Sequence, residues 1–462
     1  MRIAFISANR ENMPDAVIPI GLLYVMAATP GRHERLLWDL CFEADPLATV
    51  AKNLREHRPD LVAIGLRNLQ NMDYTSVTAN LDYYQALVRT VRKHSAAPIV
   101  LGGGGFSVAP ADLMDRLGAD FGIAGEGERA FARLLEELER PQPDFRSVER
   151  LLYRADGQLV VNGSAPDFLV MDELAPPQRE LLADRYYSEY GIESLQTKRG
   201  CPLECSYCTY PLIEGRKGRV RDPDSVADEF TRICARPGVE HLFIVDSVFN
   251  LPMRHAKAVC RALIARGNTT PWTSYVNPVA FDDELADLMV RAGATGMEIG
   301  SDSGCDEVLD RLRKGFRTDK IRRLAAIARA HGLKDGHSFI LGTAGETLDD
   351  VERTLDFVEE LDPFAALMLV WVDDNEVVNP SAALERRRFR DEVYERIRRR
   401  AETQPRWSVP RLGIRFDPRT FAVLRKFGLR GPLWQHMDKV PGSVPFSPRR
   451  APPETASGTT RP

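Results

Sequence analysis

Three cysteines lie close together in the segment Cys201-Pro202-Leu203-Glu204-Cys205-Ser206-Tyr207-Cys208. This spacing lets one loop supply three corners of a metal cluster. A cubane iron–sulfur cluster takes four ligands, usually thiolates, so three local cysteines leave one iron open to a small molecule. The pattern therefore indicates a [4Fe–4S] cluster held by Cys201, Cys205 and Cys208.

Two plainer interpretations of these cysteines stay open. A zinc site would need a distant ligand such as Cys234, because zinc usually takes its ligands as two pairs and the sequence has no second close pair. The other interpretation is a group of buried thiols without a metal. The single cysteines Cys234, Cys260 and Cys305 are expected to be dispensable for a cluster.

The cysteine loop belongs to a region in which strand and helix signals alternate. Six apolar segments predict strands, at residues 193–197, 241–245, 273–277, 296–300, 338–341 and 366–372. Strands separated by helical stretches fit a partial (β/α)6 barrel over residues 191–376, with its active site at the carboxyl ends of the strands.

A second alternating region comes first in the chain. Apolar runs at residues 3–6, 61–66, 98–101 and 120–124 predict a doubly wound, Rossmann-like α/β domain over residues 1–142. Residues 143–190 predict a linker with one hairpin, whose turn is Asp156-Gly157. A C-terminal helical extension is expected over residues 377–442, beginning with a very basic helix, and a disordered tail over 443–462.

Glycines gather where strands of the first domain are expected to end. They are Gly21, the run of residues 102–105, and Gly125 and Gly127 in Gly-Glu-Gly-Glu. Glycine lets the backbone approach a bulky ligand, and open α/β sheets bind ligands at this edge. The phosphate-loop and dinucleotide glycine patterns are absent. A nucleotide or flavin nevertheless stays an alternative to a larger cofactor.

These motifs together resemble the cobalamin-binding radical S-adenosylmethionine (SAM) enzymes. The signature is Cys-x3-Cys-x2-Cys with an aromatic residue, Tyr207, before the last cysteine, and the resemblance covers about residues 195–375. Residues 1–140 resemble the cobalamin-binding domain that precedes the barrel in one large subfamily. The resemblance implies a class B radical SAM methyltransferase, in which the open iron binds SAM and one electron cleaves it to a 5′-deoxyadenosyl radical.

The resemblance also implies cofactor contacts. Asp302 stands where glutamate is more usual in the ribose-contacting strand, Asp246 would help hold the methionyl part, and Gly342 would approach adenine. The SAM contacts implied are Tyr207, Asp246, Glu298, Ser301, Asp302 and Gly342. The cobalamin contacts implied are Gly21, Arg67, Gly103, Gly104, Gly105, Gly125, Glu126 and Gly127. No catalytic residue beyond the cluster is assigned.

The lower-face motif Asp-x-His-x-x-Gly of other cobalamin proteins is absent. We therefore expect no histidine on cobalt and interpret His33, His57 and His94 as solvated residues. Arg67 directly follows the strand at 61–66, where its side chain would face the corrin from below. A surface arginine is the plainer interpretation of the same residue.

The family's chemistry implies two roles for SAM, as methyl donor to cobalamin and as radical source. The product would be a methylated, unactivated carbon or phosphorus of a small molecule or peptide. Two rivals stay open: a cobalamin-binding enzyme that oxidises, cyclises or rearranges without methyl transfer, and a non-catalytic metal-binding scaffold.

Composition narrows the possible partners. The chain has 62 Lys and Arg against 66 Asp and Glu, a net charge of −4, which argues against nucleic acid and anionic membranes as partners. Its start lacks the order of a signal peptide, so we expect a cytoplasmic protein with reduced thiols. An electron donor such as flavodoxin or ferredoxin is expected, and the segment 431–436 is expected to cap the barrel mouth.

Overall fold

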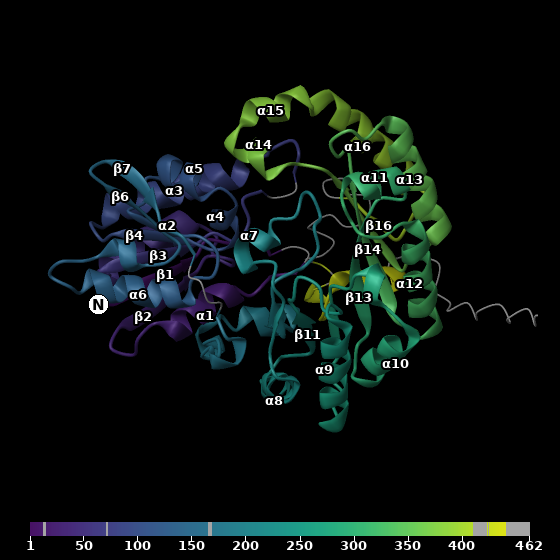
Figure 1. Cartoon of the computed structure of the whole chain (residues 1–462), viewed down its shortest axis with the longest axis horizontal. Helices are drawn as coiled ribbons and strands as arrows, with labels where there is room; N and C mark the ends of the chain where they lie inside the picture. The colour runs from purple at the N-terminus through teal and green to yellow at the C-terminus, as the bar shows by residue number, and fades with distance from the viewer. Residues whose placement is uncertain (13–14, 71–72, 165–168, 410–422, 424, 440–462) are drawn as a thin grey trace, which may run out of the picture.

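The structure, a computed structural model, describes the chain apart from residues 13–14, 71–72, 165–168, 410–422, 424 and 440–462. Two α/β units stand side by side, the N-terminal one purple and blue and the barrel teal and green (Figure 1). The prediction of a disordered tail over 443–462 falls outside the described residues.

The first unit is a seven-stranded sheet in the order β2-β1-β3-β4-β5-β6-β7. The strands are β1 (Arg2–Ser7), β2 (Glu34–Asp39), β3 (Leu61–Gly65), β4 (Ile99–Gly102), β5 (Phe121–Ile123), β6 (Leu151–Ala155) and β7 (Gln158–Val161). Strands β1 to β5 are parallel, and the β6–β7 hairpin adds two antiparallel strands. The hairpin therefore extends this sheet, so part of the segment expected as a linker belongs to the first unit.

Helices cover both faces of the first sheet, as the doubly wound prediction requires. They are α1 (Ile20–Ala28), α2 (Pro46–His57), α3 (Ala79–His94), α4 (Gly104–Val108), α5 (Pro110–Leu117) and α6 (Glu128–Leu138). Strand β3 is buried along Leu61-Val62-Ala63-Ile64 because it is central and packs on both faces. One core lies on the side of α2, α3 and α5, and the other on the side of α1 and α6.

The second unit is a partial barrel of six parallel strands, as predicted. They are β8 (Ile192–Leu195), β11 (His241–Ile244), β12 (Trp272–Ser274), β13 (Gly296–Asp302), β14 (Lys334–Leu341) and β15 (Ala365–Val370), and a short β16 (Trp407–Ser408) pairs with β15. The covering helices are α8 (Pro223–Cys234), α9 (Met253–Ala265), α10 (Asp283–Arg291), α11 (Asp306–Arg311), α12 (Thr318–Ala330) and α13 (Leu348–Leu361). Isolated parallel bridges, Trp272 with Ala294 and Tyr275 with Glu298, join β12 to β13.

After the barrel the chain returns to the first unit. Helices α14 (Asp374–Val378), α15 (Pro380–Glu385) and α16 (Arg387–Ala401) form an arch across the top of Figure 1. Val377 is buried in the core of the first unit, and the Gln70 amide donates to the Val372 carbonyl at 3.1 Å. The C-terminal extension thus ties the two units together.

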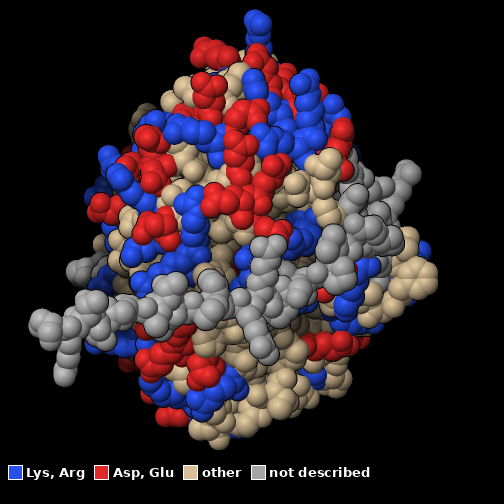
Figure 2. Space-filling view, turned by 90° about the vertical axis from the view of Figure 1, so that its right-hand side faces the viewer, with Lys and Arg blue, Asp and Glu red and all other residues tan. Residues whose placement is uncertain are grey.

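The basic helix α16 is neutralised by its surroundings. Arg400 pairs with Asp356 at 2.7 Å, and Arg398 pairs with Glu395 at 2.8 Å. Figure 2 shows Lys and Arg interspersed with Asp and Glu over this outer face of the barrel. Such alternation does not form the basic stripe that nucleic acid would need.

The segment 431–436 closes the opposite end of the barrel from the one expected. A Cβ on Gly296 or Gly336, at the starts of β13 and β14, would lie 2.9 Å or 3.2 Å from the Trp434 ring. Trp434 therefore plugs the amino end of the strands. The expectation that this segment caps the barrel mouth, at the carboxyl ends of the strands, is wrong. Gly296 and Gly336 leave room for the Trp434 indole at the amino ends instead.

Within the described residues, no helix is long and apolar enough to cross a membrane.

Candidate cofactor site between the two domains

The cysteine loop follows β8 at the carboxyl end of the first barrel strand. A short antiparallel pair, β9 (Lys198–Arg199) with β10 (Arg219–Val220), and α7 (Tyr210–Glu214) enclose it. The Cys201 N–H donates to the Gly215 carbonyl, and the Cys208 N–H donates to the Cys205 carbonyl, both at 3.2 Å. Backbone hydrogen bonds therefore help to shape this loop.

Gly200 is required for this loop to close. Its φ is +87°, and a Cβ at this position would lie 2.1 Å from the Lys217 carbonyl oxygen. Any other residue would collide with backbone and occupy a conformation that L-residues disfavour.

The three thiols are close enough to influence one another. Burial raises the pKa of the Cys208 thiol to about 11, and Cys205 and Cys201 also raise it. A cubane binds each thiolate at a different iron, so three thiols spaced along one loop fit three corners of a cluster.

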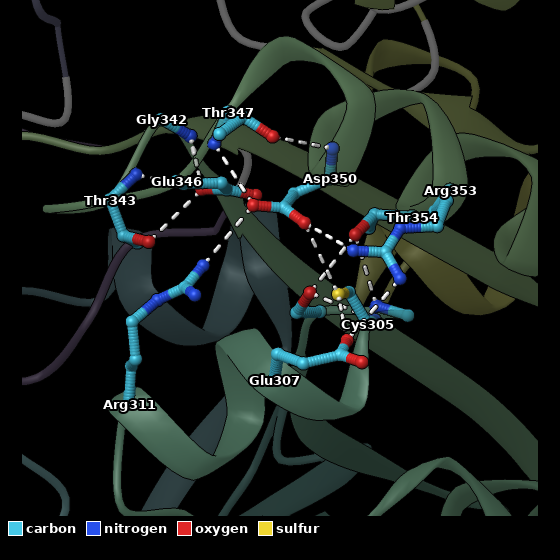
Figure 3. Close-up of polar contacts among 12 residues, drawn as sticks. Cys305, Glu307, Arg311, Gly342, Thr343, Glu346, Thr347, Asp350, Arg353 and Thr354 are labelled. Atoms are coloured by element: carbon cyan, nitrogen blue, oxygen red, sulfur yellow. Dashed lines mark hydrogen bonds and ion pairs between the residues drawn. The ribbon is translucent and has the colours of Figure 1, made fainter.

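The other cysteines are engaged elsewhere. Cys234 ends α8, away from the loop, and its thiol hydrogen-bonds to Thr270. The Cys305 thiol contacts Glu307 at 2.9 Å and Asp350 at 3.5 Å (Figure 3). These contacts support the prediction that the single cysteines are not cluster ligands.

Asp246, at the end of β11, anchors the strand that leads into the cysteine loop. Its carboxylate accepts from the Thr197 N–H at 2.7 Å, from the Thr197 hydroxyl, and from the Lys198 N–H at 3.2 Å. Burial raises the pKa of Asp246, while Lys198 lowers it. A contact between Asp246 and SAM stays a prediction, and any such contact would share a carboxylate already bound to backbone.

Tyr207 and Asp302 meet beside the cysteines. The Tyr207 hydroxyl donates to Asp302, and the Lys314 ammonium lies 2.6 Å from the same carboxylate oxygen. Asp302 has φ of +64° at an irregularity in the register of β13. The kink turns this carboxylate toward the cysteine loop, so two of the predicted SAM contacts lie together there.

Two further predicted SAM contacts on β13 have other partners. The Ser301 hydroxyl contacts His337 Nδ1 at 2.7 Å, and His337 in turn contacts Asp335 at 3.3 Å; all three are fully buried. Glu298 accepts from the Trp434 indole N–H at 2.9 Å, and burial raises its pKa to about 7. The roles of both residues toward SAM stay predictions.

Gly342 begins a rigid loop after β14. Its φ is +83°, and its N–H donates to Glu346 at 2.8 Å, as does the Thr343 N–H. Figure 3 shows this loop leading into the capping pair Thr347 and Asp350 at the start of α13. The backbone expected near adenine is thus held by hydrogen bonds to Glu346.

The predicted corrinoid contacts Glu126 and Gly125 lie against the cysteine loop. Arg199 pairs with Glu126 at 3.0 Å and with Glu128 at 2.6 Å, and Arg219 pairs with Glu126 at 2.8 Å. All four charged side chains are at most 8% exposed. We call these four residues the interdomain clamp. This buried charge network joins the first domain to the segment that leads into the cluster loop.

The glycine run serves close packing as well as ligand access. A Cβ on Gly103 would lie 2.5 Å from the Leu66 carbonyl, and one on Gly105 would lie 2.8 Å from Asn68. A Cβ on Gly104 would lie 3.4 Å from Ile213 of α7. Gly21 has nothing within 4 Å of such a Cβ and is open to a ligand. The contacts of these glycines and of Gly127 with cobalamin stay predictions.

Arg67 lies at the edge of the first sheet that faces the barrel. Its guanidinium is 4.0 Å from Glu11. Burial raises the pKa of Tyr210, and Glu298 raises the pKa of Tyr275. Arg67 lowers the pKa of both tyrosines. Tyr210 follows the cysteines and Tyr275 follows β12. Arg67 therefore stands between the two domains, where the sequence predicts it to face a corrin.

The three histidines of the first domain lie at the other edge of the sheet. His33 precedes β2, while His57 and His94 end the helices that lead into β3 and β4. The interpretation of His33 as solvated is wrong: the residue is 3% exposed, and its ring contacts the Met1 amino group at 3.2 Å. Because these strands are parallel, all three positions are at the amino edge, opposite the glycine edge. This placement supports the prediction that no histidine of this domain ligates cobalt.

We expect electron paramagnetic resonance of the Co(II) form to show no nitrogen hyperfine splitting from an axial base. The spectrum should stay unchanged in His33→Ala, His57→Ala and His94→Ala variants. Nitrogen splitting that disappears in one of these variants would contradict the assignment.

Sequence reasoning missed Arg199, Arg219 and Lys314. Arg199 adjoins the cysteines, and the paired glutamates of the Gly-Glu-Gly-Glu turn were a signal for cationic partners. No sequence signal separates Lys314 from the exposed arginines around it, because its burial depends on the turn that follows α11.

A glycine-lined sheet edge held against a three-cysteine loop fits a protein that would hold a corrinoid next to an iron–sulfur cluster. Residues 195–358 match the Radical SAM superfamily, and residues 6–135 match the B12 binding domain. The chain belongs to the cobalamin-binding radical SAM enzymes and uses a [4Fe–4S] cluster, SAM and cobalamin.

Several relatives are methyltransferases. The tryptophan 2-C-methyltransferase of Streptomyces laurentii is 29% identical over 432 residues, covering 78% of this chain and 70% of that protein. The cytidylyl-2-hydroxyethylphosphonate methyltransferase of Streptomyces wedmorensis is 25% identical, covering 76% and 75%. The radical SAM methyltransferase TsrM of Kitasatospora setae, solved with cobalamin and a [4Fe–4S] cluster, has the same fold, with a TM-score of 0.70, 24% identity and coverage of 80% and 72%.

Proposed function

We propose that this protein transfers a methyl group from SAM, by way of cobalamin, to an unactivated carbon or phosphorus of a small molecule or peptide. The observation that carries this proposal is the interdomain clamp. It joins the glycine-lined edge of the first domain, where a corrinoid would bind, to the cluster loop. A radical enzyme without a methyl carrier would not need the first domain. A carrier alone would not need three cysteines that leave an iron open.

The cofactors would supply the reactive chemistry: cobalamin would carry the methyl group, and the cluster with SAM would supply the electron and the radical. The chain positions them. Cys201, Cys205 and Cys208 hold the cluster, the glycine edge and Arg67 border the corrinoid, and Tyr210 and Tyr275 line the side of the barrel that faces Arg67. Tyr210 and Tyr275 are 39% and 38% exposed. Their rings are thus available to a substrate lying between the domains.

The test is a labelled methyl group. With a substrate, cobalamin and a low-potential reductant, labelled methyl from SAM should appear in the product, with S-adenosylhomocysteine and 5′-deoxyadenosine in comparable amounts. If 5′-deoxyadenosine forms but the product carries no labelled methyl group, the enzyme is the non-methylating rival and this proposal is wrong. S-adenosylhomocysteine alone would indicate polar methyl transfer without a radical.

A similarity to a cyclase favours testing the rival function, a cobalamin-binding enzyme that does not transfer a methyl group. The anaerobic magnesium-protoporphyrin IX monomethyl ester cyclase of Rubrivivax gelatinosus is 25% identical over 273 residues, covering 57% of this chain and 49% of that protein. Product mass separates the two functions, since only methyl transfer adds a methylene unit. The scaffold rival predicts no cleavage of SAM by the reduced protein.

The proposal extends to the electron donor and to the class of substrate. The electron that the cluster needs would come from a cytoplasmic carrier such as flavodoxin or ferredoxin. A small-molecule substrate is favoured by the tryptophan named for the Streptomyces laurentii relative, and a peptide is the alternative.

A further inference from the structure

A buried cation lies beside the cysteine loop, on an element that the cofactor motifs do not include. The Lys314 ammonium is 2.6 Å from Asp302 and 3.0 Å from the Tyr207 hydroxyl, and its side chain is 6% exposed. Lys314 follows Arg313, whose φ is +54°, and precedes Gly315, whose φ is +72°. This turn directs Lys314 inward, while Arg313 stays exposed.

The same segment is bonded to the cysteine loop. The Ser206 N–H donates to the Leu312 carbonyl at 3.0 Å, and the Ser206 hydroxyl contacts the Arg311 carbonyl at 3.4 Å. Tyr207 packs edge-on against Trp371, with ring centroids 5.3 Å apart. The position of Lys314 relative to Cys205 and Cys208 is therefore fixed by bonds on both sides.

Lys314 lies next to the residues that would hold the cluster. Its ammonium is 3.0 Å from the hydroxyl of Tyr207, which stands between Cys205 and Cys208 in the chain. A buried positive charge at this place acts on any charged group that the three cysteines hold.

We propose that Lys314 is a positioning residue that sets the reduction potential of the cluster while fixing Tyr207 and Asp302 beside it. A thiolate-ligated cluster becomes more negative by one charge when it is reduced. A fixed positive charge in a poorly solvated site favours that reduced form. Lys314 therefore makes the cluster easier to reduce, which is the step on which SAM cleavage depends. This inference requires the cluster but not the proposed methyl transfer.

The experiment is a redox titration of the anaerobically reconstituted full chain, followed by electron paramagnetic resonance of the reduced cluster. Lys314→Met should shift the midpoint potential to more negative values, and Lys314→Arg should keep it near the wild-type value. Asp302→Asn, which removes the opposing negative charge, should shift it to more positive values. The control is Lys257→Met, a lysine paired with Asp282 at 2.8 Å on the outside of the barrel.

Opposite shifts in Lys314→Met and Asp302→Asn separate an effect of charge from a general loosening of the site. An unchanged potential in Lys314→Met with full iron content overturns the proposal, as do shifts of the same sign in the two variants. If Lys314→Met does not hold a cluster, the potential of Asp302→Asn alone tests the proposal. A midpoint potential in Asp302→Asn that is unchanged or more negative than in the wild type overturns it. None of these readouts needs a substrate.

Discussion

The Cys205→Ala protein should lose the brown colour of the cluster and all reductive cleavage of SAM, and the same is expected for Cys201→Ala and Cys208→Ala. Each thiolate holds a different iron, so no neighbour can take over a missing ligand. The backbone contacts of the loop do not involve the sulfur atoms, so the variants should fold. Iron content, visible absorption and 5′-deoxyadenosine formation after anaerobic reconstitution measure the loss.

Matched controls come from the cysteines that are engaged elsewhere. Cys234→Ala and Cys260→Ala should keep the cluster and the cleavage of SAM; Cys260 lies in the hydrophobic core of the barrel. Cys305→Ala should also keep the cluster, although it removes the thiol that Glu307 and Asp350 share. Wild-type iron content in the Cys205→Ala protein would overturn the assignment of the ligands.

The alternation of strands could be predicted because buried parallel strands are continuous apolar runs. Strand β3 and the six barrel strands are of this kind. Strand β2 was missed, since it is an edge strand that begins with an exposed Glu34 and a half-buried Arg35. Strand β16 was missed for another reason: it has only two residues, Trp407 and Ser408, and exists through its pairing with β15.

The same distinction holds for the site. The three cysteines could be found because one short loop contains them all. The partners of Asp302 could not, because Tyr207 and Lys314 come from separate segments of the chain that only the barrel brings together. Glu126 follows β5 at the carboxyl edge of the first sheet, where the sequence predicts it, but its contact with Arg199 joins residues 73 positions apart. Local spacing therefore predicts ligands, while tertiary contacts decide which side chains orient them.

The interdomain clamp gives the second large effect, expected in an Arg199→Met variant. Arg199 is 5% exposed; burial lowers its pKa, but Glu128 and Glu126 raise it by more, so it stays charged. Its removal takes away the cation that pairs with the buried Glu128 at 2.6 Å. Among the described residues, one oxygen of Glu128 already has no hydrogen-bond partner. Breaking a buried pair in this way costs about 3–5 kcal/mol.

Because Arg199 joins the domains, its loss should act on their docking more than on either fold. We expect Arg199→Met to lower the thermal midpoint by several degrees and to reduce methyl transfer more than cluster content, since the cluster ligands stay in place while the cobalamin domain is held less firmly against the loop. The control Arg291→Met removes an exposed pair with Asp287 and should change stability by less than about 1 kcal/mol. Adding Glu128→Gln to Arg199→Met should restore part of the lost stability, because the double variant no longer buries an unpaired charge. If the double variant is instead less stable than Arg199→Met, the cost lies in lost packing of the arginine and not in the clamp's charges.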